Sequence, residues 1–119
     1  MILGIGNDLI EIKRVKMACE KESFLKKYYT DEEISMCSGK ASKLAGNFAV
    51  KESVAKAFGT GFRGFEAKDI EVLRDKLGKP YVNLYRGAKE KYDNLQATSV
   101  HVSISNTDEL VEAIAIVEG

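Results

Sequence analysis

Two carboxylates stand in segments whose other residues predict a buried environment. Glu52 lies in FAVKESVAKAFG, which is apolar on two sides when it is drawn as a helix, and such an element is usually buried. Asp8 lies in MILGIGNDLIEI, which reads as a strand. One face of that strand carries Ile2, Gly4, Gly6, Asp8 and Ile10. Glycines there allow another backbone or a ligand to come close to Asp8. Each carboxylate thus lies where a binding partner would explain its presence.

These residues could bind a metal ion and a phosphate. Magnesium is commonly held by one or two carboxylates, while water and substrate phosphates complete its shell. Asp8 and Glu52 would supply that pair if strand and helix meet, and Lys56, one turn after Glu52, would face the same ligand's negative charge. In the alternative, Glu52 and Lys56 form a weak surface ion pair, and Asp8 merely ends the strand or caps a helix. The small neighbours of Glu52 favour the metal site.

Two further features offer contacts for an anionic ligand. The loop GTGFRG carries the backbone amides of Gly59 and Gly61 and the charge of Arg63. The same loop is equally well explained as a helix stop. His101, the only histidine, lies on the polar side of a predicted strand, where it is either a phosphate contact or an exposed strand residue.

A basic surface is predicted on the segment after the first strand. We expect a helix from about Glu11 to about Lys27, with Arg14, Met17 and Lys21 on one stripe. Charged runs are usually solvated faces. A methionine between basic side chains, however, favours docking of an acidic helix from a partner.

Start and stop signals define the helices that follow. Thr30 and Glu33 have the spacing of a capping box, which predicts that a short helix starts at TDEEI. The helix that carries Glu52 is expected over about 43–58 and stops at Gly59.

The second half of the chain alternates between strand and turn signals. KDIEVLRD and YVNLY form a predicted hairpin around KLGKP, and RGAKEKYDNLQ reads as a short amphipathic helix. TSVHVSIS directs Val100, Val102 and Ile104 inward, and LVEAIAIVEG returns as the last strand. We therefore expect an α+β fold, in which a largely antiparallel sheet packs on a long helix within one domain, 1–119.

Composition limits the classes of function. The 119 residues are 45% hydrophobic and 30% charged, which is typical of an ordered globular chain. Because 18 basic residues balance 18 acidic ones, no global field attracts nucleic acid or membrane.

GIGND lacks the third glycine of a dinucleotide-binding motif. Cys19 and Cys37 stand in no CxxC spacing, and MILGIGNDL lacks the features of a signal peptide, so we expect a cytoplasmic protein with free thiols.

With these motifs, the sequence resembles the holo-[acyl-carrier-protein] synthase family, the short trimeric type of 4'-phosphopantetheinyl transferase. The matching segments are GIGNDLIEIKRV (4–15), YTDEE (29–33), FAVKESVAKAFGTG (48–61), LGKPYV (77–82) and HVSISN (101–106). They follow the family's order over nearly the whole chain. The family motifs G-[IV]-G-x-D-[IL] and [FW]-x-x-K-E-[AS]-x-x-K-A are both specific.

The resemblance implies transfer of 4'-phosphopantetheine from coenzyme A to a serine of apo-acyl carrier protein, with release of adenosine 3',5'-bisphosphate. Asp8 and Glu52 would bind Mg²⁺, and Lys56 would contact the coenzyme A pyrophosphate. These three residues form the expected catalytic set. Arg14 matches the family's carrier-docking arginine. The general base stays open between Glu52 and a water molecule of the metal.

The resemblance also implies a homotrimer with active sites shared between subunits, and a helix apolar on two sides fits burial of one side against a neighbour. Glu33 ends the family's F-T-x-x-E motif, here with Tyr29 in place of Phe, and its role stays open. Asn106 replaces a second histidine of many members, so any contact at this position stays open. The alternatives are a non-catalytic coenzyme A or nucleotide-binding module and a purely structural oligomer.

Overall fold

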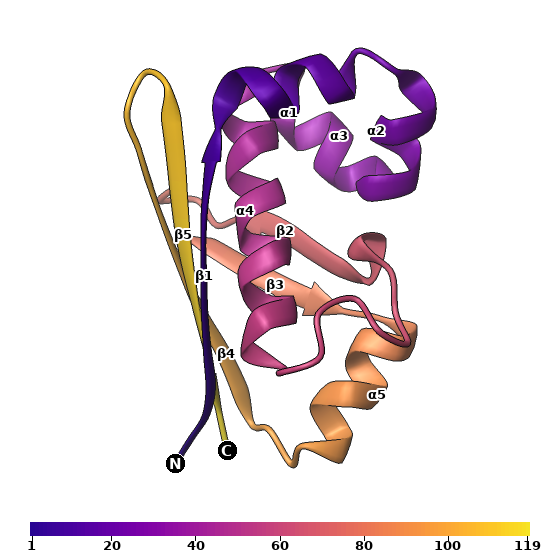
Figure 1. The fold of residues 1–119 in the computed structure, drawn as a ribbon, viewed down its shortest axis with the longest axis vertical. Coiled ribbons are helices and arrows are strands. Elements are labelled where there is room, and N and C mark those ends of the chain that lie inside the picture. The colour runs from indigo at the N-terminus through magenta and orange to yellow at the C-terminus, as the bar shows by residue number, and fades with distance from the viewer.

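The long helix α4 (Ala41–Ala57) lies at the centre of the structure, and the computed structural model describes residues 1–119 (Figure 1). An antiparallel sheet of order β1-β5-β4 packs against one side of α4. A separate antiparallel hairpin of β2 and β3 packs against another side. The strands are β1 (Ile2–Glu11), β2 (Ile70–Arg74), β3 (Pro80–Leu84), β4 (Ser99–Asn106) and β5 (Leu110–Glu118). The expected α+β class, with antiparallel strands on a long helix, is confirmed.

Short helices gather at the two ends of α4. The α-helices that precede α4 in the chain lie near its N-terminal end, and the α-helix that follows it lies near its C-terminal end (Figure 1). They are α1 (Ile12–Cys19), α2 (Glu22–Tyr28), α3 (Asp31–Cys37) and α5 (Arg86–Asn94). The predicted capping box at the start of α3 is present: the Glu33 amide donates to Thr30 Oγ1 at 3.2 Å, and the Thr30 amide donates to Glu33 Oε1 at 3.1 Å. No helix of the protein has both the length and the apolar composition that crossing a bilayer requires.

The glycines of β1 allow α4 to lie directly against this strand. A Cβ atom at Gly4 would lie 1.9 Å from the Ala57 carbonyl oxygen, and one at Gly6 would lie 1.8 Å from the Ser53 carbonyl oxygen. Neither position can hold a larger residue while strand and helix stay in place. The sequence interpretation that another backbone approaches these glycines is confirmed, and the contact places Asp8 beside α4.

The helix α4 is buried on both of its apolar sides within one chain. Ala49, Val50, Val54 and Ala55 are all at most 1% exposed, and β1, β5, α1 and β2 surround the helix. The apolar pattern is therefore satisfied without a second subunit, and it gives no support to a trimer by itself.

Two expectations for the N-terminal region are wrong. The predicted helix from Glu11 to Lys27 is two helices, because the chain turns at Glu20 and is extended at Lys21 (φ −86°, ψ 116°). Ile2 does not share the inner face of β1: it is 59% exposed, since the pairing of β1 with β5 shifts register between Ile2 and Gly4. The boundaries of α4 differ slightly from the expected 43–58.

The outer face of the three-stranded sheet is open to solvent and partly apolar. Ile5 is 59% exposed, Leu9 64% and Ile114 37%. His101 on β4 and Ile5 on β1 both pair with Ile116 on β5. Residues paired across neighbouring strands share a face of the sheet, so His101 lies on the same outer face as Ile5. The opposite face of β4 packs on the core through Val100, Val102 and Ile104, as predicted.

Candidate active site

The contact between β1 and α4 brings Asp8 and Lys56 together. Lys56 Nζ donates a hydrogen bond to the Asn7 carbonyl oxygen at 2.9 Å and lies 3.4 Å from Asp8 Oδ1. Glu52 lies one turn earlier on the same face of α4. Asp8, distant in sequence from Glu52 and Lys56, thus lies with them at one strand–helix contact.

Asp8 has an unsatisfied oxygen. Its side chain is 15% exposed, and Oδ2 is buried without any hydrogen-bond partner. Leaving a buried acceptor unpaired costs about 1–3 kcal/mol, and more for a charged group. A cation coordinated by Oδ2 would remove that cost, so the residues present fit a metal ion.

The chemistry of the donor set favours magnesium. No group of three or more His, Cys, Asp or Glu side chains is arranged to hold a metal. Two carboxylates at a partly open surface would leave most of the coordination shell to water and to phosphate oxygens, which is the usual arrangement for Mg²⁺.

Glu52 interacts electrostatically with both other members of the set. Burial and the negative charge of Asp8 raise the pKa of the Glu52 carboxyl above its usual value. The Lys56 charge and a hydrogen bond from Tyr28 act in the opposite direction but do not cancel this effect. A bound cation would relieve the repulsion between the two carboxylates.

Tyr28, at the end of α2, is a member of the site that the sequence did not indicate. Its hydroxyl donates to Glu52 Oε1 at 3.0 Å. Burial, together with the charges of Glu52 and Asp8, raises the pKa of the Tyr28 phenol, which therefore stays protonated and acts as a donor. Tyr28 follows no motif or periodicity, and only the packing of α2 on α4 reveals its contact.

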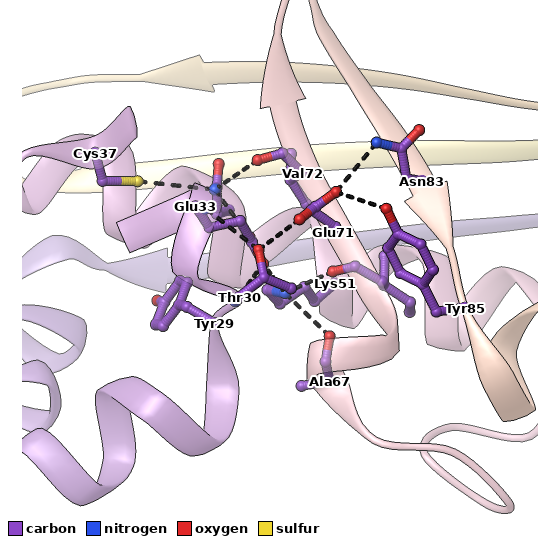
Figure 2. A network of polar contacts seen from close by, with 12 residues as sticks. Tyr29, Thr30, Glu33, Cys37, Lys51, Ala67, Glu71, Val72, Asn83 and Tyr85 are labelled. Carbon is purple, nitrogen blue, oxygen red and sulfur yellow. Dashed lines mark hydrogen bonds and ion pairs between the residues drawn. The ribbon is translucent and has the colours of Figure 1, made fainter. Parts of the chain in front are cut away.

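Lys51, the residue before Glu52 on α4, forms a buried ion pair with Glu33 (Figure 2). Lys51 Nζ lies 2.8 Å from Glu33 Oε1, and both side chains are fully buried. The ammonium also donates to the carbonyl oxygens of Ala67 at 3.0 Å and Ile70 at 2.5 Å. Because Lys51 precedes Glu52 directly, this pair anchors the turn of α4 that carries the candidate metal ligand, and Glu33 thereby gains a structural explanation.

The network continues to Glu71 on β2 (Figure 2). The Glu71 carboxylate accepts hydrogen bonds from Thr30 Oγ1 at 2.6 Å, Asn83 Nδ2 at 3.1 Å and the Tyr85 hydroxyl at 3.0 Å. The sequence signal for the network was weak: Lys51 is a charge on a helix side that is otherwise apolar, but its partners lie on other elements.

The other predicted phosphate contacts form no hydrogen bond with the side chains of Asp8, Glu52 or Lys56. The amides of Gly59 and Gly61 donate to carbonyl oxygens at the end of α4, at 2.9 and 3.2 Å, so they serve as a helix stop. Arg63 forms no ion pair and lines a groove of about 170 Å³ against α5. His101 lies on the outer sheet face, where Nε2 is 2.9 Å from Glu118 Oε1.

The predicted docking residues are exposed, but they do not form one helical stripe. Arg14 and Met17 lie on α1, whereas Lys21 lies in the break between α1 and α2. A groove of about 180 Å³ opens beside Arg14. Its lining residues are Ile10, Arg14, Val15, Ala18, Phe24 and Phe48. The groove thus connects the basic surface to the aromatic side chains next to Tyr28.

Comparison with known proteins identifies relatives along the whole chain. Residues 4–114 match the 4'-phosphopantetheinyl transferase superfamily. A holo-[acyl-carrier-protein] synthase of Lachnoclostridium phytofermentans is 54% identical over 118 residues, which cover 99% of this chain and 97% of that protein.

Solved structures agree with this result. The holo-[acyl-carrier-protein] synthase of Neisseria meningitidis has a TM-score of 0.90 at 30% identity, and the match covers 100% of both chains. The Helicobacter pylori synthase, in complex with coenzyme A, has a TM-score of 0.85 at 31% identity, over 96% of this chain and 99% of that one. The chain therefore belongs to the 4'-phosphopantetheinyl transferase superfamily, as its motifs and fold indicate.

Proposed function

We propose that this protein is a holo-[acyl-carrier-protein] synthase, which transfers 4'-phosphopantetheine from coenzyme A to a serine of apo-acyl carrier protein. Relatives similar over the whole chain carry that name, and the Helicobacter pylori relative was solved with coenzyme A. The observation that carries the proposal is the unpaired Asp8 Oδ2 at the contact that also holds Glu52 and Lys56. Two carboxylates and an ammonium group suit a diphosphate that arrives with a metal ion.

Asp8 and Glu52 would hold Mg²⁺. When bound, this ion supplies positive charge that neutralises the pyrophosphate oxygens. Lys56 has a side chain that is 53% exposed, so its ammonium can move from Asp8 to the phosphate oxygens of coenzyme A. There it would stabilise the negative charge that develops on the leaving phosphate.

The nucleophile comes from the carrier protein. Its serine oxygen attacks the phosphorus that bears the pantetheine arm, and the bond to the other phosphate breaks, which releases adenosine 3',5'-bisphosphate. Either Glu52 or a water molecule of the metal would accept the serine proton. Arg14 and Met17 on α1 would dock an acidic helix of the carrier and so position the serine.

We also propose a homotrimer in which neighbouring subunits share each site. The support is the exposed outer face of the three-stranded sheet, with Ile5, Leu9 and Ile114, which a neighbouring subunit would cover. His101 lies on this face, so it can contact coenzyme A only in a neighbour's site. Arg63 remains a candidate contact for an anionic group of coenzyme A. If sedimentation shows that the protein is a monomer under conditions in which it is fully active, this arrangement is wrong.

The whole chain, residues 1–119, would act as one transferase domain, since the matched family spans residues 4–114. We propose a cytoplasmic location, which suits the two free thiols, Cys19 and Cys37.

The test is mass spectrometry of an apo-acyl carrier protein incubated with the protein, coenzyme A and Mg²⁺. We expect a mass gain of one phosphopantetheine group, lost on chelation of the metal and reduced roughly 1,000-fold in Glu52→Gln. Binding of coenzyme A without any transfer would favour the alternative, a non-catalytic coenzyme A-binding module. Normal transfer by Glu52→Gln would contradict the assignment of the site.

A further inference from the structure

We propose that Tyr28 is a positioning residue, whose hydroxyl orients the Glu52 carboxylate for metal binding. The inference rests on the proposed metal site of Asp8 and Glu52. It adds a residue from α2, an element that carries none of the expected metal or phosphate ligands. Tyr28 itself touches neither the metal nor coenzyme A in this proposal, since it acts through Glu52 alone.

The hydrogen bond distinguishes the two oxygens of Glu52. The Tyr28 hydroxyl donates to Oε1 at 3.0 Å, whereas Oε2 accepts no hydrogen bond from the protein. A carboxylate held through one oxygen presents the other to a cation, so Glu52 would bind the metal through Oε2. Without this bond, the partly exposed glutamate side chain would rotate among several conformers, and metal binding would have to restrict that freedom.

The ring of Tyr28 is itself held in place. It stacks against Phe24 and against Phe48, with centroid distances of 5.1 Å and 4.9 Å and interplanar angles of 14° and 13°. Phe48 lies one turn before Glu52 on α4, and Phe24 lies one turn before Tyr28 on α2. A ring that stacks against two other rings keeps its hydroxyl at a fixed place, which is what orientation of a metal ligand requires.

The adjacent residue provides a matched control. Tyr29 is fully buried, whereas Tyr28 is partly buried, and the Tyr29 hydroxyl donates to the Leu44 carbonyl oxygen at 2.8 Å instead of to Glu52. Tyr28→Phe and Tyr29→Phe each remove one hydroxyl group. The first change removes the hydrogen bond to Glu52, and the second removes the bond to Leu44 and the long one that Tyr29 accepts from Cys19 Sγ at 3.9 Å. A purely structural role of Tyr28 predicts similar effects of both changes.

The experiment measures Mn²⁺ binding, as a probe of the magnesium site, by the electron paramagnetic resonance signal of free Mn²⁺ in the presence of coenzyme A. We expect Tyr28→Phe to weaken Mn²⁺ binding by about 10–100-fold, the usual cost of losing a group that orients a metal ligand. Tyr29→Phe should bind Mn²⁺ normally, although it loses thermal stability. The Mg²⁺ concentration for half-maximal transfer should rise in Tyr28→Phe only.

Two further variants separate the possible failures. If Glu52→Gln abolishes Mn²⁺ binding while Tyr28→Phe leaves it unchanged, the role of Tyr28 is wrong and the metal site stands. If Glu52→Gln also binds Mn²⁺ normally, the proposed metal site itself is wrong. Tyr28→Leu removes both ring and hydroxyl; a loss in this variant but not in Tyr28→Phe would assign the effect to packing and overturn the inference.

Discussion

Gly6 on β1 lies against the Ser53 carbonyl of α4 so closely that a Cβ atom would approach the oxygen to 1.8 Å. This backbone contact fixes the distance between the strand that carries Asp8 and the helix that carries Glu52 and Lys56. The glycines of the GIG segment therefore position the candidate site, although they bind no ligand themselves.

Substitution of Gly6 should damage the fold and the site together. Gly6→Ala forces β1 away from α4, and we expect a loss of about 3 kcal/mol of unfolding free energy together with a large loss of transfer activity. Gly59→Ala is the control: Gly59 has a φ of 82° but open space around its Cβ position, so backbone strain alone should cost about 1–2 kcal/mol. Urea denaturation measures the loss of unfolding free energy in both variants. A Gly6→Ala variant with normal stability and activity would show that neither the fold nor the site depends on the close contact of β1 with α4.

The ion pair of Lys51 and Glu33 should be sensitive to loss of one partner. Lys51→Met leaves a buried carboxylate without its cation, and we expect a destabilisation of about 3–5 kcal/mol. Adding Glu33→Gln should restore part of that loss. The exposed pair of Lys26 and Glu22 is the control, since its removal should cost less than about 1 kcal/mol. Equal costs in the buried and exposed pairs, measured by urea denaturation, would disprove the difference.

Glu71 should make stability depend on pH. Burial acts to raise the pKa of its carboxyl, but three hydrogen bonds outweigh burial and hold the pKa below its usual value. A carboxyl with a lowered pKa in the folded state contributes stability above its unfolded pKa, and this contribution is lost as pH falls through the folded pKa. At pH 7, Glu71→Gln should therefore cost about 1–3 kcal/mol.

The difference in unfolding free energy between the wild-type protein and Glu71→Gln should shrink as the pH falls below the usual glutamate value of 4.5. Thermal or urea unfolding of both proteins across that pH range measures it. If this difference stays constant with pH, the charge of Glu71 does not contribute to the stability of the fold.

Arg14 should affect the carrier protein and not coenzyme A. Arg14→Glu reverses the charge of the exposed α1 surface, and we expect the KM for the carrier to rise about tenfold, roughly 1.4 kcal/mol, with unchanged binding of coenzyme A. The effect should fade at high salt. Lys89→Glu on α5 controls for net charge. An equal rise in KM for both variants would place carrier docking elsewhere.

Local signals in the sequence predicted much of the fold. The capping box of Thr30 and Glu33, the glycine after α4 and the alternation of β4 each depend on residues close in sequence, and each was found as expected. The break between α1 and α2 was not predictable in the same way, because neither glycine nor proline marks Glu20 or Lys21. There the packing of α2 on the core decides where the helix ends.

The candidate site divides along the same line. Asp8 and Glu52 were recognisable because a charge interrupts an apolar pattern, and that anomaly is visible in a single segment. The contact of Tyr28 with Glu52 joins residues 24 positions apart. The network around Lys51 joins α3, α4 and the start of β2. Such contacts form only when the elements have packed, so no local sequence pattern predicts them.

Anomalous diffraction from crystals grown with coenzyme A and Mn²⁺ tests the central claim most directly. We expect one Mn²⁺ peak within about 2.2 Å of an oxygen of Asp8 and of an oxygen of Glu52, beside the coenzyme A pyrophosphate. A structure with coenzyme A bound, in which the metal lies away from either carboxylate or no metal is present, would contradict a shared metal site at the contact of β1 and α4.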